Sequence, residues 1–196
     1  MERLLKQGYV VLAPDLAGTG ELGRVTDAVA FVGVQVGRSV AGIRAGDIAR
    51  CVQFLRRRSD VDSENIGALA LGEMAIPLLH AAALNESIRK VALLEPLVSV
   101  QSVVMNRYYN LDPGSLVANI LTAYDLPDLA ATLAPRKLLV VNALDQVQKP
   151  ASAETVDKSY DVVRRTYSQR GAAASLVIRA GVLAPAIDEA LAAWLR

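Results

Sequence analysis

The sequence has few of the residues from which metal sites and disulfides are built. Its 196 residues include one cysteine and one histidine, which excludes a disulfide framework, a multi-cysteine zinc site and a histidine-rich metal cluster. No run approaches the ~18 apolar residues of a membrane span. Lysine and arginine total 21 against 20 aspartate and glutamate, without the basic excess of a nucleic-acid binder. We therefore expect no cofactor, no metal, no nucleic-acid partner and no membrane partner.

The composition is that of a folded domain. Hydrophobic residues make up 53% and charged residues 21%, so disorder is excluded and a sizeable core is available. The length fits one domain over residues 1–196. The first eight residues, Met1–Gly8, contain no apolar stretch of the secretory type. The chain as given is therefore expected to be cytoplasmic. If it is a fragment of a longer secreted protein, its localisation stays open.

Short runs of valine, leucine and isoleucine alternate with helical patterns, as is typical of repeated β-α units around a parallel sheet. The runs are apolar throughout, which indicates strands covered by helices on both faces. The predicted strands are Tyr9–Pro14, Asn65–Leu71, Lys90–Glu95, Lys137–Ala143 and Leu176–Arg179.

The clearest helix is Gly46–Arg58, in which four apolar residues follow the i, i+3, i+4, i+7 spacing. They are Ile48, Cys51, Val52 and Leu55. Asp47 lies near the predicted start and three arginines lie at the end, where each charge complements the helix dipole. Further helices are predicted at Ile76–Leu84, Ser152–Gln169 and Pro185–Arg196, with one or two more inside Ser99–Pro135.

One segment resembles a known strand and turn. The residues Gly8-Tyr9-Val10-Val11-Leu12-Ala13-Pro14-Asp15, followed by Gly18-Thr19-Gly20-Glu21, are similar to the G-Y-V-V-L-A-P-D-x-x-G-x-G-E of α/β-hydrolases. The similarity continues in order through Gly42-Ile43-Arg44 with Asp47, Asp60–Gly67, Tyr108-Tyr109-Asn110, Tyr124–Leu129 and Leu133–Arg136. Together these segments resemble the bacterial acetyl-xylan-esterase-like or dienelactone-hydrolase-like branch. The resemblance implies an incomplete α/β-hydrolase fold of about five mostly parallel strands, in a family of serine esterases.

The family's nucleophile position carries no nucleophile in this chain. Its elbow, G-x-S-x-G, holds a serine on a strained turn between a strand and a helix. The aligned stretch is Ala70-Leu71-Gly72-Glu73-Met74, which places Gly72 at the serine position and the backbone N–H of Glu73 at an oxyanion-hole position. Glycine at a sharp turn also needs no catalytic explanation, since it adopts conformations that other residues avoid.

The family's catalytic triad also contains an acid and a histidine, and this chain carries the expected residue type only at the acid position. The acid position, after the strand of type L-L-V-V-N-x-x-D, carries Asp145, which would orient an imidazole or else serve only as a loop carboxylate or helix cap. The histidine position follows Leu176–Arg179, where no histidine occurs. His80 lies eight residues beyond Gly72 on a helix, roughly 10 Å away or more, and is expected to be a packed helix residue. Cys51, on an apolar stripe, is expected to act as a small hydrophobic residue.

Three other patterns offer alternative sites. Gly18–Gly23 matches the G-x-G-x-x-G of dinucleotide-binding folds, where Gly18, Gly20 and Gly23 would approach a phosphate. Four carboxylates near strand ends could hold a hard cation or could be solvated loop residues: Asp15, Glu73, Glu95 and Asp145. Three tyrosines could line a sugar pocket or could simply be half-buried: Tyr108, Tyr109 and Tyr124.

The family's fold has strands before the one that matches Tyr9–Pro14, and its third strand lies between that one and the one matching Asn65–Leu71. Three possibilities follow: these two strands pair directly, another chain supplies the missing part, or the chain is a truncated reading frame. An edge strand at Tyr9–Pro14 would carry no charge and only a terminal proline to prevent pairing with another copy. We therefore expect homo-oligomers.

The resemblance and the lost triad residues lead to one main expectation. The chain is expected to be a degenerate or truncated homologue of acetyl-xylan-esterase-like hydrolases that is catalytically inactive, with a small ester or acylated sugar as its ligand. The alternatives are an active carboxylic-ester hydrolase that uses Asp145, Glu73 and a bound water, and a nucleotide-binding domain.

Overall fold

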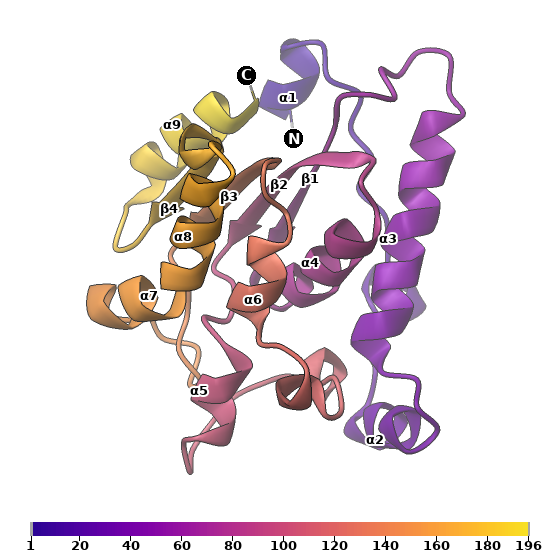
Figure 1. Ribbon diagram of the computed structural model, residues 1–196. Coiled ribbons are helices and arrows are strands. Elements are labelled where there is room, and N and C mark those ends of the chain that lie inside the picture. The colour runs from indigo at the N-terminus through magenta and orange to yellow at the C-terminus, as the bar shows by residue number, and fades with distance from the viewer. Residues whose placement is uncertain (1, 196) are drawn as a thin grey trace.

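Four of the predicted apolar runs form one parallel sheet in the computed structural model, which describes residues 2–195 (Figure 1). The strands are β1 (Ile66–Leu71), β2 (Ile88–Leu94), β3 (Lys137–Val141) and β4 (Leu176–Arg179), and they lie in sequence order across the sheet. All three neighbouring pairs are parallel, because a helical segment returns the chain to the same edge after each strand. The predicted α/β class is confirmed.

Helices cover both faces of the sheet. Alternate residues of β3 face opposite ways: Leu138 and Val140 enter a large core, whereas Leu139 and Val141 enter a smaller one against Trp194. The large core lies under α4 (Ala75–Leu84), α6 (Leu126–Ala131) and α8 (Asp161–Gln169), with α3 (Val40–Arg56) packed on α4. The small core lies under α9 (Ala184–Leu195).

The remaining elements are short. They are α1 (Glu2–Lys6), α2 (Asp27–Gln35), α5 (Val100–Val104), α7 (Ala153–Ser159) and the 3₁₀ turns η1 (Gly20–Leu22), η2 (Gly72–Met74), η3 (Pro113–Ser115), η4 (Ile120–Thr122) and η5 (Ala173–Ser175). The long segment after β2 thus contains two α-helices, as expected. Within residues 2–195, every helix is too short or too polar to cross a bilayer.

The prediction of a strand at Tyr9–Pro14 is wrong. These residues have no sheet partner, and Tyr9, Val10 and Leu12 are exposed. Apolar composition suits a segment to a sheet, but a strand forms only where a neighbouring strand supplies hydrogen bonds, and β1 is bonded on one side only. The possibility that this segment pairs directly with the Ile66–Leu71 strand is thereby contradicted. Because no strand forms at this position, the expected edge strand is absent at Tyr9–Pro14, and the edges of the sheet are β1 and β4.

Two helix predictions need correction at their boundaries. The Ser152–Gln169 pattern forms two helices, α7 and α8, which are separated at the buried Tyr160. The Gly46–Arg58 pattern belongs to α3, which begins six residues earlier because the Ser39 hydroxyl accepts the Gly42 N–H at 3.1 Å as a cap. Asp47 therefore lies inside α3 and cannot act on the positive end of its dipole.

Candidate active site

The carboxyl ends of the strands form a single edge at which the chain turns sharply. Leu71, Leu94 and Val141 lie in register, and the next residues, Gly72, Glu95 and Asn142, have φ values of 57°, 52° and 53°. Open parallel sheets bind ligands at this edge.

Gly72 occupies the turn expected of a nucleophile elbow. It follows β1 directly, has a left-handed conformation, and leads through η2 into α4. A Cβ atom built on Gly72 would meet no other atom within 4 Å. The strand–turn–helix geometry and the open space for a nucleophile are therefore present, while the nucleophile itself is not.

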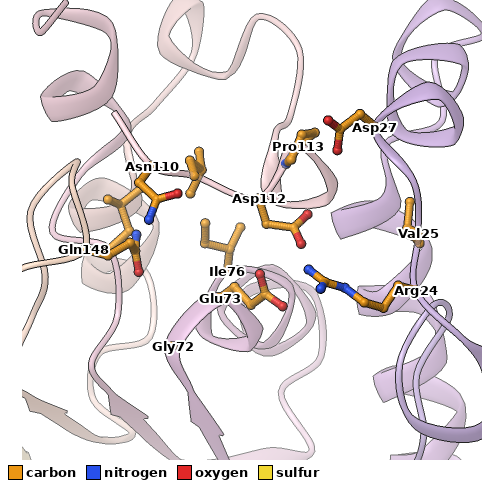
Figure 2. Close-up of a pocket in the computed structure, with 12 residues that line it drawn as sticks. Arg24, Val25, Asp27, Gly72, Glu73, Ile76, Asn110, Asp112, Pro113 and Gln148 are labelled. Carbon is orange, nitrogen blue, oxygen red and sulfur yellow. The ribbon is translucent and has the colours of Figure 1, made fainter. Parts of the chain in front are cut away.

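A polar cavity of about 380 Å³ opens beside this turn (Figure 2). Twelve residues line it: Arg24, Val25, Asp27, Gly72, Glu73, Ile76, Leu97, Asn110, Leu111, Asp112, Pro113 and Gln148. Figure 2 shows the carboxylates of Glu73 and Asp112 directed toward one another, with the guanidinium of Arg24 directed at both. We refer to this space as the polar cavity.

The pKa of Glu73 is raised above its ordinary value. Partial desolvation contributes most, although the side chain remains open to solvent on one side, and the neighbouring Asp112 carboxylate adds to it. The positive charges of Arg44 and Arg24 act in the opposite direction. The carboxyl groups of Glu73 and Asp112 can accept hydrogen bonds, and a carboxyl group that holds its proton can also donate one. Sequence reasoning identified Glu73 only for its backbone N–H and missed Asp112, which no motif marks.

Arg44 and Asp47 hold the loop that borders the polar cavity. Arg44 is 2% exposed, and its Nε donates to the Ala17 carbonyl at 2.9 Å. One helical turn later, the Asp47 carboxylate accepts the Ala17 N–H at 3.2 Å. The Nη1 of Arg44 is buried and has no hydrogen-bond partner among the described residues. Arg44 and Asp47, which belong to the segments that resemble α/β-hydrolases, thus position the loop from which Arg24 extends.

Asp145 is engaged within its own loop. Its Oδ1 accepts the N–H groups of Val147 and Lys149, both at 2.9 Å. Asp145 does not line the polar cavity, whereas Gln148 of the same loop does. These contacts favour the interpretation of Asp145 as a loop carboxylate.

His80 is packed in the way its position in the helix predicts. Its Nδ1 lies 2.8 Å from the Ile76 carbonyl and its Nε2 lies 2.9 Å from the Tyr124 hydroxyl. Because a carbonyl can only accept, Nδ1 carries the proton and Nε2 accepts from Tyr124. Burial lowers the pKa of His80, which favours this neutral form. Both nitrogens are occupied, and Tyr124 lies against His80 rather than in the polar cavity.

The segment after β4 has a fixed backbone. The side-chain amide of Asn142 donates to the Val182 carbonyl at 2.9 Å and accepts the Val182 N–H at 3.0 Å. The resemblance to esterases leads us to expect a histidine here, and the residues present are Ala180-Gly181-Val182-Leu183.

The other candidate residues are not brought together. Within residues 2–195, no three histidine, cysteine or acidic side chains are grouped as a metal site would require. Asp15 accepts the Glu21 N–H in its own loop, and Glu95 is exposed. Burial, together with the charge of Asp47, raises the pKa of the Cys51 thiol, which disfavours a reactive thiolate.

The glycine motif lacks the context of a dinucleotide site. Gly18 and Gly20 have positive φ values because the loop folds tightly on itself, with Val25 and Asp15 within about 2.1 Å of where Cβ atoms would lie. The segment before them is not a strand, and the next helix, α2, begins with the acidic Asp27. An acidic first turn does not favour a phosphate. Tyr108 and Tyr109 are exposed and do not line the polar cavity.

The fold is that of solved carbohydrate esterases. A Bacteroides fragilis protein with a provisional assignment as an acetyl xylan esterase matches 91% of this chain and 48% of its own, at 18% identity and a TM-score of 0.74. A methylesterase matches 92% of this chain and 39% of its own, at 21% identity and 0.59. A glucuronoyl esterase from Sporotrichum thermophile matches 81% and 51%, at 16% identity and 0.59.

The chain thus spans about half the length of these structures or less. At these identities the likeness shows a shared α/β-hydrolase-type fold. No protein-family model matches the sequence, and no curated protein matches it significantly.

Proposed function

We propose that this chain is an esterase-fold domain that no longer hydrolyses esters, and that it binds a neutral, hydroxyl-rich ligand of the acylated-sugar class in the polar cavity. The observation that carries the proposal is the elbow at Gly72, which keeps the left-handed turn and the open space but has no side chain to attack an ester. The engaged nitrogens of His80 and the engaged Oδ1 of Asp145 support the loss of hydrolysis.

The lining of the polar cavity favours a neutral ligand. Three carboxylates, those of Asp27, Glu73 and Asp112, line the polar cavity together with one guanidinium, that of Arg24, so an anion would be repelled. The amides of Asn110 and Gln148 add donors and acceptors, as hydroxyl groups require. A volume of about 380 Å³ lies within the usual range for small-molecule sites.

Titration calorimetry with an acetylated xylo-oligosaccharide tests the proposal. We expect measurable binding that weakens about tenfold in Asp112→Asn and in Glu73→Gln, because a hydrogen bond to a charged group contributes roughly 1.5–3 kcal/mol. Glu154→Gln, an exposed residue at the start of α7, is the matched control and should bind as the wild type does. Equal binding by all three variants, or none by the wild type, would contradict the proposal.

A second candidate function is hydrolysis by carboxylates and water. The raised pKa of Glu73 beside Asp112 favours this pair over the pair of Glu73 and Asp145, because Asp145 binds its own loop. The Glu73 carboxylate would take a proton from a water that attacks the ester carbonyl, and the protonated Glu73 would return this proton to the leaving alkoxide as the ester C–O bond breaks, which releases acid and alcohol and restores the carboxylate. Turnover of p-nitrophenyl acetate that is abolished in Glu73→Gln would favour this candidate over the first.

A further inference from the structure

We propose that an apolar groove beside the polar cavity binds an acyl or aromatic arm of the same ligand, so that the site as a whole takes an amphiphilic molecule. The groove has a volume of about 620 Å³ and is lined by Asp27, Ala28, Ala30, Phe31, Val34, Pro113, Leu116, Val117 and Ala118. This inference rests on the proposed function for the polar end of the ligand.

The helix that forms one wall of this groove is unusually apolar for the surface. In α2, Asp27 and Gln35 are the only residues with polar side chains, and Ala30 is the only buried one. Phe31 is 65% exposed and Val32 is 55% exposed. A surface helix that had only to cover a core would turn polar side chains outward. A cluster of exposed apolar side chains on a folded protein often marks a site that binds a ligand or a partner.

The groove and the polar cavity adjoin each other. Asp27 and Pro113 line both, and Figure 2 shows them at the end of the polar cavity that lies beyond Asp112. One molecule can therefore extend from the Glu73–Asp112 pair past Pro113 onto Phe31. The contrast between the two linings fixes its direction, with hydroxyl groups at the carboxylates and the apolar arm along α2.

We assign the groove to the ligand rather than to a separate partner because the two spaces adjoin. Its lining comes from two segments only, α2 and the Pro113–Ala118 stretch, both of which also contribute to the polar cavity. Burial of a methylene group contributes about 0.8 kcal/mol, which corresponds to about fourfold in affinity. The affinities of glycosides with alkyl arms of increasing length therefore show whether the arm occupies the groove.

The experiment is a calorimetric titration of the whole chain with methyl, butyl and hexyl β-D-xyloside, below their micelle concentrations. We expect the dissociation constant to fall about fourfold for each added methylene until the groove is filled. Phe31→Ser should weaken binding of the hexyl glycoside about tenfold and leave the methyl glycoside unchanged. Val32→Ser is the control, because Val32 is also exposed on α2, at 55%, but does not line the groove.

The outcomes separate this inference from the proposed function. Binding of all three glycosides with equal affinity would overturn the groove while leaving the sugar site in place. Binding of none would overturn the proposed function and this inference with it. An equal loss of affinity for the hexyl glycoside in Phe31→Ser and Val32→Ser would show unspecific adsorption to α2 and would overturn the inference. A dimer in light scattering that Phe31→Ser dissociates would assign the groove to a second copy of the chain and would overturn it as well.

Discussion

The substitution Gly72→Ser tests the proposed loss of ester hydrolysis most directly. Gly72 has a φ of 57° and nothing within 4 Å of a Cβ, so a serine fits in space but is strained in backbone. The left-handed conformation costs a residue with a Cβ about 1–2 kcal/mol. We expect a folded variant whose free energy of unfolding falls by that amount in chemical denaturation. Gly181→Ser is the matched control, since Gly181 has a φ of 66° and equally open surroundings.

We expect Gly72→Ser to hydrolyse p-nitrophenyl acetate at close to the buffer rate. A serine without its base forfeits a factor of about 10⁶, or roughly 8 kcal/mol of barrier reduction. Both nitrogens of His80 are engaged, so it cannot take the hydroxyl proton. Initial rates, a burst phase and labelling by a fluorophosphonate measure the outcome.

A second substitution supplies the missing base. Leu183 is 80% exposed, whereas Val182 packs against the α9 core, so Leu183→His disturbs the fold less than Val182→His. Gly72→Ser combined with Leu183→His should exceed the single variant in rate. The reasoning is refuted if Gly72→Ser alone hydrolyses well above background, or if the wild type does so and Asp145→Asn abolishes it.

Three further predictions concern stability and assembly. Arg44→Met should lower the free energy of unfolding by about 2–3 kcal/mol, because it removes a buried charged donor to the Ala17 carbonyl. The control Arg50→Met removes an exposed ion pair and should lower the free energy of unfolding by less than about 1 kcal/mol. Equal losses in the two variants would contradict the role of Arg44 in holding the loop. The folded protein binds the Glu73 proton more tightly than the unfolded chain does, so this group stabilises the fold below its ordinary pKa of 4.5, and the contribution is lost as pH rises through the raised value. Because this contribution falls as pH rises, the wild type should lose stability relative to Glu73→Gln across the acid range in denaturation experiments, and parallel curves would be the opposing result. The unpaired edge of β1 carries no charged side chain, so we expect light scattering at micromolar concentration to show dimers of the wild type. Leu69→Lys should be monomeric. A wild type that scatters as a single monomeric species would count against this association.

Local patterns in the sequence determined the layered architecture. Continuous apolar runs identify parallel strands because residues on both faces of a central strand lose contact with water. This holds for β3 and for most of β2, whereas the edge strand β1 leaves Leu69 and Leu71 exposed and β4 is only partly buried. The helical spacing from Gly72 to His80 likewise showed that this imidazole is a packed residue. The sequence also showed that the turn after β1 carries Gly72 in place of a serine and that no histidine follows β4.

Only the tertiary structure decided which polar groups meet. Glu73 and Asp112 are far apart in sequence, and no periodicity relates a helix start to a residue in an irregular segment. Tyr9–Pro14 has the composition of a strand, yet pairing depends on a neighbour that the described chain does not provide. The role of Asp145 depended on whether its own loop turned back to donate N–H groups. The sequence predicts burial along an element because burial follows local periodicity, whereas the site depends on loops whose course long-range packing determines.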